Sequence, residues 1–185
     1  MFTELEALHM MRELLIGLDV MGAQGIVHCD LKPENILIGK EDGRLKICDF
    51  GLASFAAAPP HDFDGTLWYS SPEQLLSEGS CGPAVDAWAL GCIMAELLTG
   101  EPLIKGLGTA HQLTSIVYLF GISDEVSKID LGVDASAQSE LRDIVPEKLL
   151  SSAGFDVLQG LLRFDPTERL TPAAALRMKW FSGAG

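Results

Sequence analysis

The chain has few basic residues for its size. Its 185 residues include 13 Lys and Arg against 26 Asp and Glu, which gives a formal net charge of −13. Nucleic acids and anionic membrane surfaces are bound through basic patches, so this balance argues against both as partners. It also means that binding of an acidic ligand must depend on a metal cation and a few well-placed basic side chains.

Long apolar runs are also absent. The longest, residues 87–95, is far shorter than the roughly 18 residues that a membrane span needs. The N-terminus shows no basic region followed by an apolar run, so no signal peptide is evident. We therefore expect an intracellular protein, cytoplasmic or nuclear, that has no membrane partner.

The cysteine pattern lacks the spacing of a metal site. None of the four cysteines (Cys29, Cys48, Cys81 and Cys92) forms a CxxC pair, and no histidine pair lies near them. This pattern predicts free thiols in a reducing compartment.

Hydrophobic spacing predicts one mainly helical domain. Hydrophobic residues make up 48% of the chain, enough for a sizeable core. Leucines and methionines at helical spacing from Leu5 to Met21 predict an amphipathic helix that ends near residues 22–25. A helix from Pro83 to Thr99 is apolar nearly all round and should lie at the centre of the fold. Further helices are expected at residues 110–120, 152–163 and 173–179.

Short strands and loops are predicted between these helices. Residues 35–38 and 45–48 are β-like and flank a turn-rich cluster, which predicts a small hairpin. Residues 49–73 show little periodicity and should form a long loop, a feature that is often functional. Residues 123–146 are polar and mixed, which predicts an irregular surface segment.

Two motifs follow the first predicted helix. The first is Ile26-Val27-His28-Cys29-Asp30-Leu31-Lys32-Pro33-Glu34-Asn35, and the second is Asp49-Phe50-Gly51. Together they resemble the catalytic loop and the metal-binding turn of a protein kinase. An isolated Asp-Phe-Gly is a weak signal, but this one begins fourteen residues after Asn35 and further motifs follow in family order.

Three downstream segments strengthen this resemblance. Residues 65–73 resemble the end of a kinase activation segment, residues 85–92 the central helix of the large lobe, and residues 165–171 the closing arginine motif. The resemblance implies that Glu73 and Arg169 form a buried ion pair. It also implies that Asp86 holds the backbone of the catalytic loop.

The chain is most similar to the cyclin-dependent kinase branch of the serine/threonine kinases. The similarity rests on residues 31–35, 67–69, 90–96 and 112–125. It implies a mainly α fold, the C-terminal lobe of a protein kinase with a small β-hairpin by the active site, with the N-terminal lobe missing. The implied domain covers residues 1–185, with the catalytic loop at 26–38, the activation segment at 49–73, the central helix at 83–99 and C-terminal helices at 110–181.

The resemblance also assigns roles to individual residues. Asp30 is the expected catalytic residue that orients the acceptor hydroxyl, and Lys32 is expected to neutralise the γ-phosphate. Asn35 and Asp49 are the expected Mg²⁺ ligands, and Leu37 is the expected floor under the adenine of ATP. The implied activity is transfer of the ATP γ-phosphate to Ser/Thr hydroxyls of protein substrates. A cyclin-like regulatory subunit is a further partner that the branch allows.

The chain departs from the family pattern at two positions in these motifs. Cys29 stands where an arginine usually binds a phosphorylated residue of the activation segment, and residues 55–65 contain no Ser, Thr or Tyr. We interpret this loop as one not switched by phosphorylation, or as the remnant of a lost switch. Ser70 replaces an arginine of the proline pocket, which argues against proline-directed specificity.

The segment before the catalytic loop is short. Only 29 residues precede Asp30, and the glycine-rich phosphate loop, the strand lysine and its glutamate partner are absent. The isolated chain is therefore expected to have weak activity or none. The alternative function is that of a non-catalytic, lobe-only protein, either a pseudokinase or a truncated product, that acts through partner binding.

Overall fold

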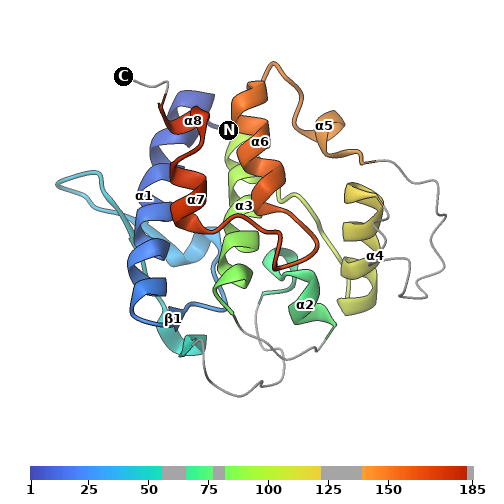
Figure 1. The fold of residues 1–185 in the computed structure, drawn as a ribbon, viewed down its shortest axis with the longest axis horizontal. Helices are drawn as coiled ribbons and strands as arrows, with labels where there is room; N and C mark the ends of the chain where they lie inside the picture. The colour runs from blue at the N-terminus through green and yellow to red at the C-terminus, as the bar shows by residue number, and fades with distance from the viewer. Residues whose placement is uncertain (56–65, 77–81, 122–138, 183–185) are drawn as a thin grey trace.

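The computed structural model describes residues 1–55, 66–76, 82–121 and 139–182 (Figure 1). The helices are α1 (Glu4–Ala23), α2 (Pro72–Leu75), α3 (Pro83–Thr99), α4 (Thr109–Phe120), α5 (Leu141–Ile144), α6 (Ser152–Leu161), α7 (Pro172–Leu176) and α8 (Lys179–Ser182). The strands are β1 (Ile26–Val27), β2 (Ile36–Ile38), β3 (Leu45–Ile47) and β4 (Ser54–Phe55). Three 3-10 turns are η1 (Pro33–Asn35), η2 (Phe50–Leu52) and η3 (Leu67–Tyr69). The fold is mainly helical, as predicted.

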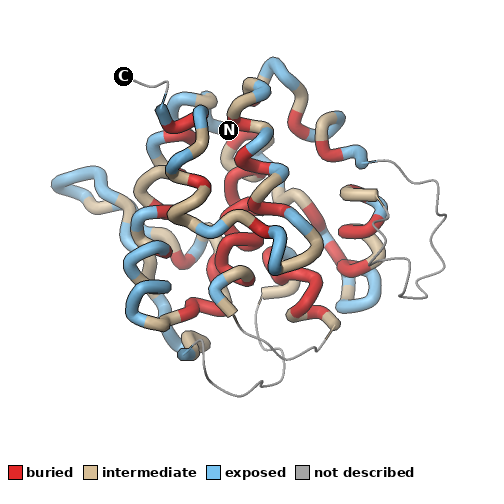
Figure 2. The backbone as a smooth tube through the Cα atoms, in the orientation of Figure 1, coloured by how far each residue is buried: buried red, intermediate tan, exposed pale blue. Residues whose placement is uncertain are grey.

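Helix α3 forms the centre of the molecule. It packs against α1 and α6, and α1 packs in turn against α7 and α8. Figure 2 shows α3 buried along most of its length, and Trp88 in its middle is fully inaccessible. Because Pro83 lacks an N–H it fits the first helical turn, and Gly100 ends the helix in a left-handed conformation (φ 83°). The predicted central helix is therefore confirmed, with the same ends.

Helix α1 has a sequence-encoded start. Thr3 accepts a hydrogen bond from the backbone N–H of Glu6, and the Glu6 carboxylate accepts one from the Thr3 N–H in return. This capping box satisfies two of the N–H groups left over at a helix start. The buried face of α1 then presents Met11, Leu15 and Leu18 to the core. The helix leads directly into the predicted catalytic loop, because the chain enters β1 three residues after α1 ends.

Two small antiparallel sheets flank the candidate site. The predicted hairpin is confirmed: Ile36 pairs with Ile47, and Ile38 pairs with Leu45. Glu13 on α1 accepts a hydrogen bond from the Leu45 N–H at 2.8 Å, which anchors the hairpin to the helical body. The second sheet, β1 with β4, was not predicted, because strands of two residues carry no hydrophobic periodicity.

Other expectations are corrected by the structure. The predicted last helix at residues 173–179 is two shorter helices, α7 and α8, because α7 ends at Leu176. Part of the segment expected to be irregular forms α5, while its residues 123–138 lie outside the described residues, as do 56–65 of the predicted loop. None of the helices in the described part of the chain has the length and hydrophobicity that a membrane span requires.

The prediction of free thiols holds for some cysteines only. Cys48 and Cys92 are free. Cys29 is disulfide-bonded, so the prediction is wrong at this position. Spacing along the sequence could not reveal this bond, because pairing depends on the distance between two cysteines in space. Cys81 lies outside the described residues.

Candidate active site

The carboxylate of Asp30 is held by two neighbours. Its Oδ2 accepts a hydrogen bond from Lys32 Nζ at 2.8 Å, and its Oδ1 accepts one from the Thr66 backbone N–H at 2.7 Å. Lys32 Nζ also donates to Thr66 Oγ1 at 2.7 Å, which closes a triangle of contacts. Asp30 and Lys32 are thus brought together as the sequence predicted. Thr66 thereby contacts the predicted catalytic loop through both residues.

These contacts decide the charge of Asp30. Partial burial acts to raise the pKa of this carboxyl group, but the hydrogen bonds from Lys32 and Thr66 outweigh burial and lower the pKa below its usual range. Asp30 is therefore ionised at neutral pH. An ionised carboxylate can accept a hydrogen bond from a hydroxyl group, as a base or orienting group must.

Asp86, near the start of α3, holds the loop backbone before Asp30. Its carboxylate accepts hydrogen bonds from the N–H groups of His28 at 2.7 Å and Cys29 at 3.0 Å, as the resemblance implied. Burial raises the pKa of Asp86 to about 6, although these two hydrogen bonds act to lower it. His28 is itself fully buried, and its Nε2 lies 2.9 Å from the Cys48 carbonyl oxygen. The structure thus uses His28 as a support of the loop.

Asn35 and Asp49 supply oxygen donors near the loop. Asn35 is buried, and its Nδ2 donates to the Asp30 carbonyl oxygen at 2.9 Å, which fixes the side-chain amide. Asp49 is exposed, adopts a left-handed backbone (φ 61°) and accepts a hydrogen bond from the Gly51 N–H. Among the described contacts, none joins Asp49 to the other predicted site residues.

Asn35 and Asp49 offer oxygen atoms of the kind that Mg²⁺ takes as ligands. The described residues contain no cluster of three or more His, Cys, Asp or Glu side chains able to hold a metal ion. Mg²⁺ usually takes one or two protein oxygens and fills its other positions with water and phosphate. An amide oxygen from Asn35 and a carboxylate from Asp49 match that requirement.

The predicted adenine-contact residue lies on an exposed strand. Leu37, in β2, has 52% of its surface exposed, and its neighbour Ile38 has 60%. Phe50, which follows Asp49, is also exposed (49%). Apolar side chains with this degree of solvent exposure offer a binding surface for an apolar ligand or for another protein domain.

Sequence reasoning missed a contact between α2 and the predicted catalytic loop. Gln74 in α2 donates a hydrogen bond from Nε2 to the Cys29 carbonyl oxygen at 3.2 Å. The Ser71-x-x-Gln74 spacing is that of a capping box, so the local cap could have been predicted. The contact with Cys29 could not, because it joins residues 45 positions apart.

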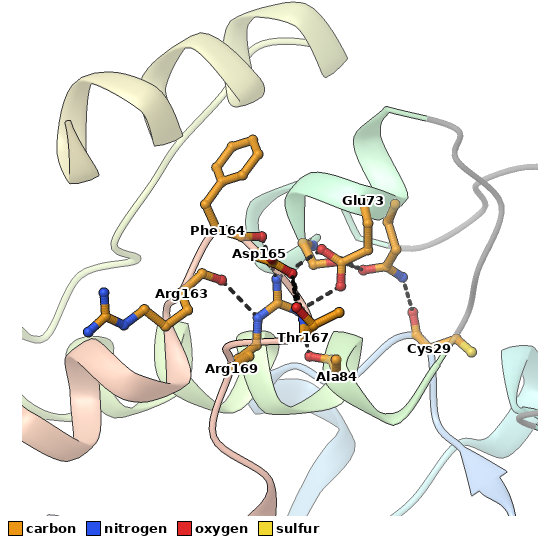
Figure 3. A network of polar contacts seen from close by, with 10 residues as sticks. Cys29, Glu73, Ala84, Arg163, Phe164, Asp165, Thr167 and Arg169 are labelled. Carbon is orange, nitrogen blue, oxygen red and sulfur yellow. Dashed lines mark hydrogen bonds and ion pairs between the residues drawn. The ribbon is translucent and has the colours of Figure 1, made fainter. Parts of the chain in front are cut away.

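Figure 3 shows a buried ion pair between Glu73 and Arg169. Arg169 contacts both Glu73 oxygens, with Nη1–Oε1 at 2.6 Å and Nη2–Oε2 at 2.9 Å. Its guanidinium also donates to the carbonyl oxygens of Arg163, Phe164 and Ala84. The predicted pair of Glu73 and Arg169 is confirmed, and it joins α2 to the segment between α6 and α7.

These features place the chain in a known family. Residues 1–181 match the protein kinase domain, and the chain belongs to the protein kinase family. Over 99% of its length it is 44% identical to a protein of Oryza sativa subsp. japonica that carries the name cyclin-dependent kinase F-2. It is 40% identical over 93% of its length to the cell division control protein 2 homolog 3 of Trypanosoma brucei brucei. The chain spans 59% and 58% of the lengths of these two relatives.

A third relative extends the same branch. Cyclin-dependent kinase G-2 of Oryza sativa subsp. indica is 36% identical over 97% of this chain, which corresponds to 28% of that protein. These relatives agree with the cyclin-dependent kinase branch that the motifs indicated. The structure and the relatives together identify the fold as that of the large, C-terminal lobe of a protein kinase.

Proposed function

We propose that the chain is the large lobe of a serine/threonine protein kinase, similar to cyclin-dependent kinases, which transfers the γ-phosphate of ATP to protein hydroxyls. The observation that carries this proposal is the ionised Asp30 carboxylate held between Lys32 and Thr66. Residues 26–38 would serve as the catalytic loop, 49–73 as the activation segment, 83–99 as the central helix and 110–181 as the C-terminal helices.

The proposed chemistry follows from the positions of two side chains. Asp30 accepts a hydrogen bond from the substrate hydroxyl and takes its proton as the hydroxyl oxygen bonds to the γ-phosphorus and the bond to the ADP oxygen breaks. Lys32 lies against Asp30 and places a positive charge where the transferred phosphoryl group carries negative charge. The catalytic roles of both residues stay predictions.

Asn35, Asp49 and Leu37 would complete the nucleotide site. Mg²⁺, when bound by Asn35 and Asp49, would neutralise charge on the phosphates of ATP. Leu37 would contact the adenine through its exposed side chain. Protein substrates, and a cyclin-like subunit by analogy with the names of the relatives, are the proposed partners. An intracellular location, cytoplasmic or nuclear, is part of the same proposal.

Partner binding without catalysis is a second candidate function. The exposed apolar side chains of Leu37, Ile38 and Phe50 favour it, because a protein that covers them would remove apolar surface from water and so bind favourably. The two candidates differ in what the polar residues do. In the second, changing Asp30 or Asp49 would leave the function intact.

The test is Mg²⁺-dependent transfer of labelled phosphate from ATP to Ser/Thr residues of a mixed protein substrate. The protein is purified from its own cells, and the variants are made in the same full-length polypeptide. Asp49→Asn should abolish the transfer, whereas Asp156→Asn, the same change at an exposed position of α6, should leave it unchanged. Transfer that survives Asp49→Asn would overturn the proposed metal role of this residue.

A second measurement concerns the chain of residues 1–185 alone. We expect it to bind Mg·ATP weakly. The described part of the chain supplies oxygen ligands, one lysine and the exposed Leu37 side chain, but no residues that would enclose the phosphates from the opposite side. Isothermal titration calorimetry measures this directly. A sub-micromolar dissociation constant would contradict the expectation.

A further inference from the structure

The peptide unit that leads into Asp30 is held at both ends. Cys29 has a left-handed backbone (φ 66°), which residues other than glycine adopt infrequently. The carbonyl oxygen of Cys29 accepts the hydrogen bond from Gln74 Nε2 at 3.2 Å (Figure 3). The N–H of Asp30, at the other end of the same peptide unit, lies 3.3 Å from His28 Nδ1.

The planarity of the peptide makes these two contacts act together. The C=O of Cys29 and the N–H of Asp30 lie in one rigid plane, so they cannot rotate independently. A contact that fixes the carbonyl therefore also fixes the direction of the Asp30 N–H and the position of the Asp30 Cα, the atom from which the side chain leaves. The Asp30 carboxylate is already held at its far end by Lys32 and Thr66.

Gln74 is well suited to this role because both ends of its amide are bonded. Its Oε1 accepts hydrogen bonds from Ser71 N at 3.0 Å and Ser71 Oγ at 3.1 Å, within the cap of α2. Its Nε2 is the donor to Cys29. An amide accepts at one end and donates at the other, whereas an ionised carboxylate only accepts, so a glutamate of the same shape could cap α2 but could not donate to Cys29.

We propose that Gln74 is a positioning residue for Asp30, and that its hydrogen bond to Cys29 couples the Gln74 side chain to the peptide unit that precedes the Asp30 side chain. The coupling uses neutral groups and needs no phosphate on the activation segment. This inference rests on the proposed role of Asp30. It concerns the loop geometry, so it can be tested with or without kinase activity.

The test uses variants that separate the two ends of the Gln74 amide. Gln74→Glu keeps the acceptor for Ser71 and loses the donor to Cys29, whereas Ser71→Ala weakens the cap and keeps that donor. Gln159→Glu, the same change at an exposed position of α6, is the control for added charge. Gln74→Met, which has a similar length and no donor, replaces Gln74→Glu if the latter does not fold.

The first readout is the hydrogen-exchange rate of the Asp30 amide, measured by NMR at one fixed redox state. Gln74→Glu should raise this rate at least fivefold, and Ser71→Ala and Gln159→Glu should keep it within twofold of the original. An unchanged rate in Gln74→Glu would overturn the proposal. An equal rise in Ser71→Ala, or a rise spread through α1 and α3, would overturn it as well.

The second readout is phosphate transfer by the full-length protein. Gln74→Glu should lower kcat at least tenfold while the KM for ATP stays within twofold, because the orientation of Asp30 matters to the reaction step. A raised KM with an unchanged kcat would contradict the positioning role. The two readouts can also disagree. If the original protein transfers no phosphate, the proposed function is wrong. If Gln74→Glu still raises the exchange rate in the loop alone, the structural role of the Gln74 contact is nevertheless supported.

Discussion

Arg169 binds Glu73 through two parallel hydrogen bonds across 96 positions of the sequence. The side chain of Arg169 is fully buried, and that of Glu73 is 6% exposed. The two-pronged geometry suits a guanidinium and a carboxylate, which are planar and matched in spacing. Because the pair connects the segment that contains α2 with the segment before α7, it links the candidate site to the C-terminal part of the core.

Removal of one partner should therefore be costly. Glu73→Ala leaves the buried Arg169 cation without its counter-charge, and we expect a loss of about 3–5 kcal/mol in the free energy of unfolding. Urea denaturation measures this loss. Lys105→Ala, which breaks an exposed ion pair with Glu101, is the control and should cost less than about 1 kcal/mol. A cost for Glu73→Ala as small as that of the control would show that the buried pair is not a structural support.

The raised pKa of Asp86 predicts a pH dependence of stability. Burial gives this carboxyl group a pKa of about 6 in the folded state, against about 3.9 when unfolded. Between these values the folded state binds more protons, so the contribution of Asp86 to the free energy of unfolding falls as pH rises from about 4 to about 6. The fall is at most about 1.4 kcal/mol per pH unit and stops above the folded-state pKa.

The comparison with Asp86→Asn isolates this contribution, because asparagine does not titrate. The difference in unfolding free energy between the original protein and the variant should shrink as pH rises from 4 to 6 and then stay constant. Denaturation curves at several pH values give this difference. A difference that grows over the same interval would mean that the pKa of Asp86 is lowered in the fold.

Lys32 should control the ionisation of Asp30. Burial opposes ionisation of this carboxyl group, and the hydrogen bond from Lys32 is the first of the contacts that counter it. Lys32→Met should therefore raise the pKa of Asp30, whereas Lys46→Met on the exposed face of β3 should leave it unchanged. NMR titration of the Asp30 carboxyl carbon measures the pKa. An unchanged pKa in Lys32→Met would contradict the described contact.

The cysteines should differ in reactivity. Burial raises the pKa of the Cys92 thiol to about 12, so this side chain should resist alkylation in the folded protein. Cys48 is a partly accessible free thiol and should react without reduction. Cys29 should react only after reduction of its disulfide. Mass spectrometry of alkylated peptides distinguishes the three, and labelling of Cys29 without reductant would contradict the described bond.

Local patterns in the sequence predicted the parts of the fold that depend on neighbours along the chain. The ends of α3 followed from Pro83 and Gly100, and the hairpin followed from two β-like runs around a turn. The contact between Asp30 and Lys32 belongs to the same class, since the residues lie two positions apart. Family resemblance added the pair of Glu73 and Arg169, which spacing alone does not reveal.

The features that were missed depend on distance in space. The pairing of β1 with β4 joins Ile26 to Phe55, and the contact of Gln74 with Cys29 spans 45 positions. Neither leaves a periodic signal, because each rests on one or two backbone groups. The disulfide of Cys29 was missed for the same reason. The resemblance therefore predicted the supporting contacts of Asp86 and of Glu73 with Arg169, whereas the contact of Gln74 with Cys29 was not predicted.

The central claim is that Asp30 serves phosphate transfer from ATP to protein hydroxyls. The most direct test compares the rate of this transfer by the full-length protein with that of Asp30→Asn, which keeps the shape of the side chain and removes its charge. Asp19→Asn, at an exposed position of α1, is the control. We predict that Asp30→Asn lowers the rate at least a hundredfold, as expected for loss of a positioned base. Equal rates for Asp30→Asn and the original protein would contradict the account.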